Sequence, residues 1–154
     1  MTTKTVVADG EGRFAIQEHR ELAAGLAYIA ETVEGSVDLT STELWARLHH
    51  ALGWLERELT PHLAWEDAFV YPQIDTVAGT PWATKAARFE HRQIGTVISV
   101  LEADSARWLG RSTRRTDAEM VAHLSAIRAL IAAHMEREER FLLPLIEDGT
   151  PAPG

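Results

Sequence analysis

The sequence carries one polar pattern twice, and this duplication is the strongest constraint on how the chain can fold. In the first copy His19 is followed 43 residues later by His62, and in the second copy His91 is followed after the same interval by His134. Each position lies 72 residues from its counterpart. Both copies continue as His-x3-Glu, with a Phe three residues and a Pro six residues after that Glu. Many apolar positions drift between the copies while these residues are kept, which packing alone does not explain.

Each His-x3-Glu motif fits one face of an α-helix. Residues i and i+4 of a helix lie on the same side, about 6 Å apart, so the imidazole and the carboxylate point to the same place. The two motifs and the two single histidines supply six nitrogen and oxygen ligands, which is enough for a site with two metal ions. The six candidate ligands are His19, His62, Glu66, His91, His134 and Glu138.

Apolar residues recur with the 3.6-residue period of a helix through most of the chain. We predict four helices, over about 12–34, 40–75, 80–109 and 116–144. Thr40-x2-Glu43 and Thr116-x2-Glu119 match the capping box that opens a helix. Pro61 lies inside the second helix and predicts a kink there, because proline removes a backbone hydrogen bond.

Four long helices with short connections predict an all-α fold, an antiparallel up-down-up-down four-helix bundle with an internal two-fold sequence repeat. The 154 residues fit one domain, 1–154, whose bundle spans about 12–147 between short flexible N- and C-terminal tails. Gly110 is expected to stop the third helix, and Phe69 and Phe141 are expected to plug the short end of the bundle. In this topology all four repeated histidines fall at one height.

The candidate ligands continue the apolar stripes of their helices, so they are expected to face the interior. A single buried His is most often a hydrogen-bonded core residue, but two inward carboxylates are costly to bury unless they are paired or bound to metal. The conjunction therefore favours a metal site. The sequence contains no Cys, which excludes thiolate sites, and the nitrogen and oxygen ligands suit iron, manganese or zinc.

Two further acidic residues remain open as additional ligands. Glu58 lies one turn before His62, but Pro61 disturbs the helix phase, so a solvated charge is the preferred interpretation. Glu139 directly follows Glu138, and about 100° of helical rotation points it aside.

The complete set of motifs resembles the hemerythrin-like, or HHE cation-binding, domain over about 12–147. The resemblance implies a bundle that holds two iron ions, the first bound by His19 and His62 and the second by His91 and His134. It also implies that the ions are bridged by the two motif glutamates and by an oxo or hydroxo group.

Two departures from the oxygen-carrying members of this family matter. Those proteins have a second His one turn after the first on the third helix, where this chain has Gly95. Their last carboxylate is an Asp five residues after the His, whereas Glu138 follows His134 by four. We expect Gly95 to face the second iron and to leave a position open to a small ligand. This argues against a simple reversible oxygen carrier.

The preferred hypothesis is a hemerythrin-like non-haem di-iron protein that binds dioxygen or a related small oxidant, such as peroxide or nitric oxide, with turnover left open. The alternative is an iron- or redox-responsive regulatory module without catalysis. The net charge of −8 argues against a nucleic-acid partner. No segment approaches the roughly 18 apolar residues of a membrane span, and the first ten residues lack the apolar core of a signal peptide. We therefore expect a cytoplasmic protein with small-molecule partners, and the sequence leaves its oligomeric state open.

Overall fold

The computed structural model describes residues 11–108 and 113–146, and within them it contains helices and no strand. The predicted all-α class is therefore confirmed. The predicted stop at Gly110 and the two predicted tails lie outside the described residues. Within the described part of the chain, no helix combines the length and the apolarity that a bilayer crossing requires.

The helices join into four long rods. The first is α1 (Glu11–Glu34), followed by a short 3₁₀ turn, η1 (Ser36–Asp38). The third is α5 (Lys85–Trp108). The second rod runs without a break through α2 (Ser41–Trp54), η2 (Leu55–Leu59), α3 (Thr60–Trp65), η3 (Glu66–Val70) and α4 (Tyr71–Ala78). The fourth consists of α6 (Arg114–Arg137), η4 (Glu138–Leu142) and η5 (Leu143–Leu145).

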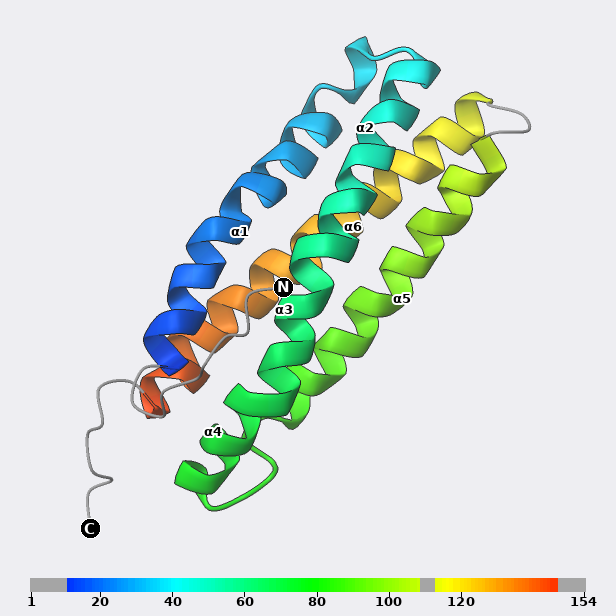
Figure 1. The fold of residues 1–154 in the computed structure, drawn as a ribbon. Helices are drawn as coiled ribbons and strands as arrows, with labels where there is room; N and C mark the ends of the chain where they lie inside the picture. Colours follow the sequence, from blue (N-terminus) through cyan, green and yellow to red (C-terminus); the bar gives the residue numbers. More distant parts are fainter. Residues whose placement is uncertain (1–10, 109–112, 147–154) are drawn as a thin grey trace.

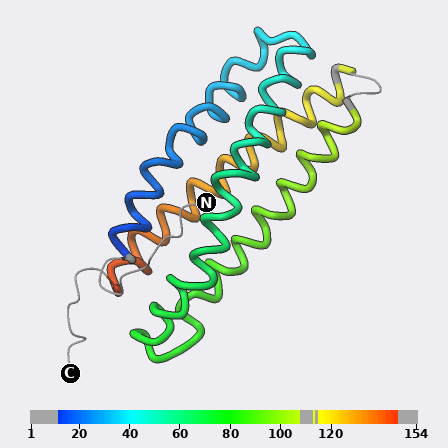
Figure 2. The backbone as a smooth tube through the Cα atoms, viewed as in Figure 1, coloured from blue at the N-terminus to red at the C-terminus, as the bar shows by residue number. Residues whose placement is uncertain are grey.

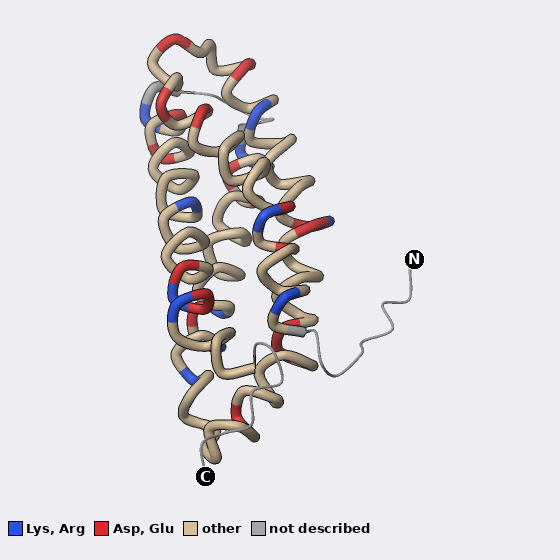
Figure 3. Tube along the Cα trace, turned by 90° about the vertical axis from the view of Figure 1, so that its left-hand side faces the viewer, with Lys and Arg blue, Asp and Glu red and all other residues tan. Residues whose placement is uncertain are grey.

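The four rods lie side by side along one long axis (Figures 1 and 2). In the view of Figure 1 the chain runs upward in α1, downward from α2 to α4, upward in α5 and downward in α6. Acidic and basic residues are interspersed along the length of these rods (Figure 3).

The helix starts show where local sequence signals decide the structure. Thr40 caps α2 as predicted, because its side chain accepts from the Glu43 amide and the Glu43 carboxylate accepts from the Thr40 amide. The second predicted capping box is wrong: α6 begins earlier, with Thr113 as its cap and Thr116 as the reciprocal partner. The start of α5 also differs from the prediction at residue 80, because residues 81–84 form a turn before the helix begins at Lys85.

The second and fourth rods contain three wider, π-helical segments, and one of them lies just before Pro61, where a kink was predicted. They are η2, η3 and η4, and each one ends two residues before a proline. A proline lacks the amide hydrogen that an α-helix needs, and its ring crowds the carbonyl four residues earlier. In each segment a later amide bonds five residues back instead, as when the Tyr71 amide donates to the Glu66 carbonyl. The wider turn accommodates the proline and the rod continues.

The interior contains two apolar clusters with a polar layer between them. The larger cluster includes Leu59 and Ile94, and the smaller one includes Val70 and Tyr71. The predicted plug at the short end is wrong, because Phe69 and Phe141 are 52% and 67% exposed. They share the wide turns η3 and η4, which direct Val70 and Leu142 inward instead.

Candidate metal centre

The polar layer between the two clusters brings together all six predicted ligands. Each rod contributes: α1 carries the first histidine, α3 and η3 carry a histidine and a glutamate, α5 carries a histidine, and α6 and η4 carry the last pair. All six are buried, with relative exposures of 7% or less, and the two glutamates have no exposed surface. The residues in this layer are His19, His62, Glu66, His91, His134 and Glu138.

The first group of donors lies between α1 and the second rod. Glu66 places one carboxylate oxygen 3.2 Å from Nε2 of His62 and the other 3.7 Å from Nε2 of His19. The two imidazole rings meet edge to face, with centroids 5.2 Å apart. One donor atom from each of these three residues falls within 4.8 Å of the other two, which is close enough to surround one ion.

The second group lies between α5 and α6 and shares Glu66 with the first. The Nε2 atoms of His91 and His134 are 2.9 Å apart, and a Glu66 oxygen lies 3.5 Å from the first and 4.0 Å from the second. Glu138 contacts Nε2 of His134 directly. These four residues again offer donor atoms within 4.8 Å of one another. Glu66 is therefore common to both groups, whereas Glu138 belongs to the second.

A carboxylate approaches the outer nitrogen of every one of the four rings. Nδ1 of His62 lies 2.5 Å from Glu18, and Nδ1 of His19 lies 3.0 Å from Glu139. These two contacts recur in the other half of the repeat. There, Nδ1 of His91 lies 3.1 Å from Asp67, and Nδ1 of His134 lies 3.7 Å from Glu90.

These outer carboxylates fix the orientation of the rings. An imidazole that donates its Nδ1 hydrogen to a carboxylate presents the Nε2 lone pair on its other side, which is the arrangement typical of metal-bound histidines. Residues 18 and 90 are repeat counterparts, as are 67 and 139. The sequence repeat could therefore have identified these four carboxylates as parts of the site. Helical rotation directs Glu139 away from the ligand face of its own helix, but its carboxylate contacts His19 on α1.

Tyr71 is a residue of the site that the sequence analysis missed. It is fully buried, and its hydroxyl lies 2.9 Å from Nε2 of His91 and 3.5 Å from Nε2 of His134. Its repeat counterpart is Leu143, which is also fully buried but carries no polar atom. The repeat could not reveal Tyr71 for this reason. The phenol therefore makes the surroundings of the two donor groups different.

The inner faces of these side chains carry buried polar atoms without a hydrogen-bond partner. They are Nε2 of His19 and His62 and both carboxylate oxygens of Glu66 and Glu138, and on the outer side Nδ1 of His134 also has no hydrogen-bond partner. Uncompensated buried carboxylates are costly, and a bound cation removes that cost. Imidazole nitrogens with carboxylate oxygens suit iron, manganese or zinc. The residues present therefore fit a pair of such ions.

The two glutamates strongly affect the protonation of the cluster. Burial, followed by the neighbouring Glu66, raises the pKa of Glu138 to about 8. Burial also opposes ionisation of Glu66, but its close contacts with the polar groups of Glu138 and the histidines outweigh burial and hold its pKa well below the usual value. Burial acts to lower the pKa of His134, yet its contacts to Glu138 and Glu66 outweigh this and raise the pKa to about 10. Glu138 and His134 thus hold protons beside the ionised Glu66, where a metal ion would otherwise supply positive charge.

Tyr71 remains a hydrogen-bond donor in this environment. Burial and the negative charges of Glu66 and Glu138 raise the pKa of its phenol far above the usual range. The hydroxyl therefore keeps its hydrogen next to the second donor group.

Gly95 was predicted to face the second iron, but the structure places it at the surface. It is exposed, and a Cβ built on it would meet no atom within 4 Å. The buried stripe of α5 passes through His91, Ile94 and Ile98. Gly95 lies beside this stripe, in a surface hollow between α3 and α5 that also touches His91. The expectation that Gly95 faces the buried ions is wrong, because the buried stripe of α5 continues from His91 to Ile94 and Ile98 and leaves Gly95 exposed.

These features define a class of protein: a helical protein with a buried histidine and carboxylate cluster that could hold metal ions. A model of the hemerythrin HHE cation-binding domain matches residues 14–146, and the chain belongs to this family. The resemblance seen in the motifs is thereby confirmed. No curated protein and no solved structure matches the chain.

Proposed function

We propose that this chain is a non-haem di-iron protein that binds dioxygen or a related small oxidant, such as peroxide or nitric oxide. The observation that carries the proposal is the convergence of four imidazole Nε2 atoms on two fully buried carboxylates. We assign His19 and His62 to one ion and His91 and His134 to the other, in an antiparallel up-down-up-down bundle.

Glu66 and Glu138 are proposed as the bridging carboxylates. Support is strongest for Glu66, whose two oxygens lie within 4.0 Å of all four Nε2 atoms. Glu138 supports the second ion through its contact with His134. Two histidines and one or two carboxylates per ion leave coordination positions open, as in non-haem iron sites that handle oxygen.

A pair of bound iron ions would supply reversible electron transfer to a small oxidant. The protein residues provide the surroundings for this chemistry. Glu18, Asp67 and Glu139 hold the rings of their partner histidines by accepting at Nδ1. The Tyr71 hydroxyl can donate a hydrogen bond to a ligand beside the second ion. The two apolar clusters keep bulk water from the layer.

Two arguments favour an oxidant-handling site over a simple oxygen carrier. The candidate ligands include four histidines. This is one fewer than in the oxygen-carrying members, which have a further His at the position of Gly95. Gly95 is exposed, so it does not provide the open position beside the ion that was predicted from the sequence. The tyrosine instead places a hydrogen-bond donor on one side of the site, which suits chemistry that develops negative charge on a bound oxidant better than symmetrical storage of a gas molecule.

Metal analysis combined with an optical spectrum before and after peroxide addition tests the proposal. Two irons per chain, an oxo-bridge absorption band and gas release after peroxide would support turnover. A stable oxygenated spectrum would instead support the carrier function. A single zinc ion per chain would contradict every redox function proposed here. The cytoplasmic location remains a prediction.

A further inference from the structure

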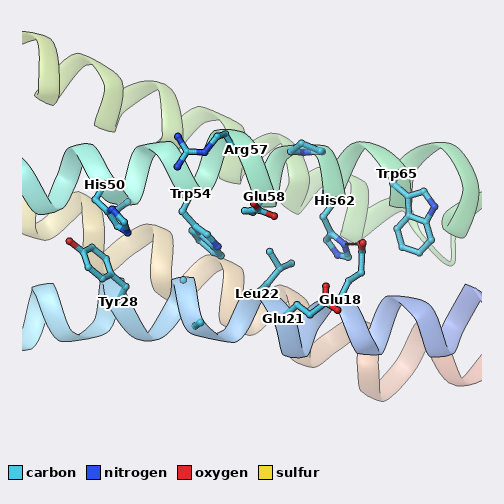
Figure 4. A pocket seen from close by; sticks show the side chains of 14 residues that line it. Glu18, Glu21, Leu22, Tyr28, His50, Trp54, Arg57, Glu58, His62 and Trp65 are labelled. Atoms are coloured by element: carbon cyan, nitrogen blue, oxygen red, sulfur yellow. Dashed lines mark hydrogen bonds and ion pairs between the residues drawn. The ribbon is translucent and has the colours of Figure 1, made fainter. Parts of the chain in front are cut away.

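A cavity of about 650 Å³ opens between α1 and the second rod, next to the metal centre (Figure 4). Its wall includes Trp54 and Leu22 in the middle and Tyr28 at the end away from the metal centre. At the other end it reaches His62 and Trp65. The volume and the aromatic lining are typical of a site for a small organic molecule.

The aromatic wall depends on a glycine in α1. A Cβ built on Gly25 would lie 1.8 Å from Cε2 of Trp54. The indole therefore rests directly against the backbone of α1, at a distance that only glycine allows. In this position Trp54 is one of the lining residues of the cavity.

The charges around the cavity are predominantly negative. Glu18, Glu21 and Glu58 line it, and Arg57 is the one Lys or Arg among the described lining residues, which also include His50 and His62. The guanidinium of Arg57 lies over Gly53, with a nitrogen 2.9 Å from the position of a Cβ there, so it is drawn back along its own rod. Glu58 instead points into the space between the rods (Figure 4).

The sequence repeat includes the residues of the metal centre but not those that are particular to this cavity. The metal-centre residues of the lining, Glu18 and His62, recur 72 residues later as Glu90 and His134. The residues that give the cavity its shape and charge do not recur. The counterparts of Glu21, Gly25, Trp54 and Glu58 are Gln93, Val97, Ala126 and Leu130. The repeat thus keeps the residues of the proposed metal centre but not those of the cavity. This difference indicates that metal binding does not require the cavity.

We propose that the cavity binds a small organic cation with a flat apolar body, such as an arylalkyl primary amine or an aromatic amidine. The ring would lie against the Trp54 indole, and the cationic group would lie between the carboxylates of Glu21 and Glu58. Carboxylates attract the charge, and an indole face attracts both a cation and an apolar ring. An anionic ligand would meet three carboxylates, and a larger ligand would exceed the volume. The site goes beyond the proposed oxidant binding and meets it at Glu18, which contacts His62.

Titration with phenethylamine tests this site. The amine is protonated at neutral pH, and phenethyl alcohol serves as the uncharged control with the same ring. Calorimetry and tryptophan fluorescence should both report binding of the amine, and the alcohol should bind at least about tenfold more weakly, which corresponds to one ordinary charge interaction. Equal affinity for the amine and the alcohol would overturn the role of the carboxylates.

Two charge-removing variants locate the site. Glu58→Gln and Glu21→Gln should each weaken phenethylamine binding by about three- to tenfold, because each removes one carboxylate that faces the cation. Glu102→Gln removes the same charge from a different hollow on α5 and should leave the affinity unchanged. If all three variants bind the amine as the parent protein does, the ligand does not occupy this cavity and the proposal fails.

The outcome is independent of the metal proposal. Metal content is measured in the same samples, so a protein without iron that binds phenethylamine would contradict the di-iron function and leave the cavity assignment intact. Absence of binding for both phenethylamine and benzamidine at millimolar concentration, in a protein of full metal content, would overturn the cavity assignment alone.

Discussion

The hydroxyl of Tyr71 lies 2.9 Å from Nε2 of His91, on the inner side of the buried donor cluster. Within 11–108 and 113–146, no tyrosine makes a comparable contact to the first donor group, and the repeat counterpart of Tyr71 is Leu143. One ion would therefore have a protonated phenol as a neighbour and the other an apolar side chain. The two halves of the site are related in sequence and unequal in chemistry.

This inequality predicts the behaviour of Tyr71→Phe. The variant keeps the ring and loses only the hydroxyl, so the metal content should stay at the parent value while the optical spectrum and any peroxide reaction change. Loss of one hydrogen-bond donor in such a site lowers a reaction rate by about 10²-fold or more. Tyr28→Phe, at the far end of the cavity, removes a hydroxyl away from the cluster and serves as the control. An unchanged rate and spectrum in Tyr71→Phe would show that the phenol is only a packing residue.

The shared position of Glu66 predicts how metal is lost. Glu66→Ala and Glu138→Ala should each release both ions if both carboxylates bridge, whereas His19→Ala and His91→Ala should each weaken mainly one ion. Metal content per chain, measured after dialysis, distinguishes these results. Because Glu138 contacts only the second donor group here, loss of a single ion from Glu138→Ala would leave Glu66 as the bridge and remove Glu138 from that role.

Removal of the ions should lower the stability of the bundle. A ligand that binds only the folded state stabilises it by about 4 kcal/mol when its free concentration is 1,000-fold above the dissociation constant. Chelation should therefore lower Tm and speed hydrogen exchange of amides around His62 and His134 more than at the far end of the rods. Wholesale loss of helix on chelation would favour the regulatory alternative. An unchanged Tm would mean that the six residues do not bind metal.

The outer carboxylates should affect metal affinity without contacting the ions. Glu18→Gln replaces the acceptor of the His62 Nδ1 hydrogen by a weaker, uncharged one, and a change of this kind costs about 10- to 100-fold in metal affinity. Glu21→Gln makes the same charge change one turn away, where the side chain contacts only Gln17 among the interactions found for it. Competition with a chelator measures both variants. Equal metal affinities of Glu18→Gln and Glu21→Gln would show that the change in overall charge, and not the lost contact with His62, weakens metal binding.

Two glycines in the middle of helices should respond oppositely to substitution by alanine. Gly95 has open space where a Cβ would stand, so Gly95→Ala should stabilise the protein by up to about 1 kcal/mol and leave its metal content intact. Gly25→Ala would collide with the Trp54 indole and should destabilise the protein. Denaturant unfolding compares the two. A stable Gly25→Ala variant would show that the indole can leave its place against α1.

Much of the fold and the central ligands could be predicted from the sequence, because both depend on periodicity along single helices. His62 and Glu66 share a helix face whatever the surrounding packing, and the repeat identified the same pair again in the second half. The Thr40 cap was predictable for the same local reason. These signals need only the chain within one helical turn.

The remaining features depend on contacts between rods or on changes of helical phase, which a single helix does not report. Glu139 contacts a histidine 120 residues away, and Tyr71 reaches across to α5. The exposure of Phe69 follows from a wide turn that an ideal α-helical count does not include. Gly95 was placed by counting one turn from His91, although small phase errors decide between the core and the surface at the edge of a stripe.

The wide turns that begin at Glu66 and Glu138 also separate the helical phase of the residues before and after them in the second and fourth rods. A π-helical turn is equivalent to an α-helix with one residue inserted, so deletion of one residue from 68–70 would rotate everything after it by about 100° relative to the ligands. Tyr71 would then leave His91, while His62 would keep its place. The length of this turn therefore sets whether the second ion has a phenol beside it, and a change of one residue in length could alter the chemistry of the site without replacing a single ligand.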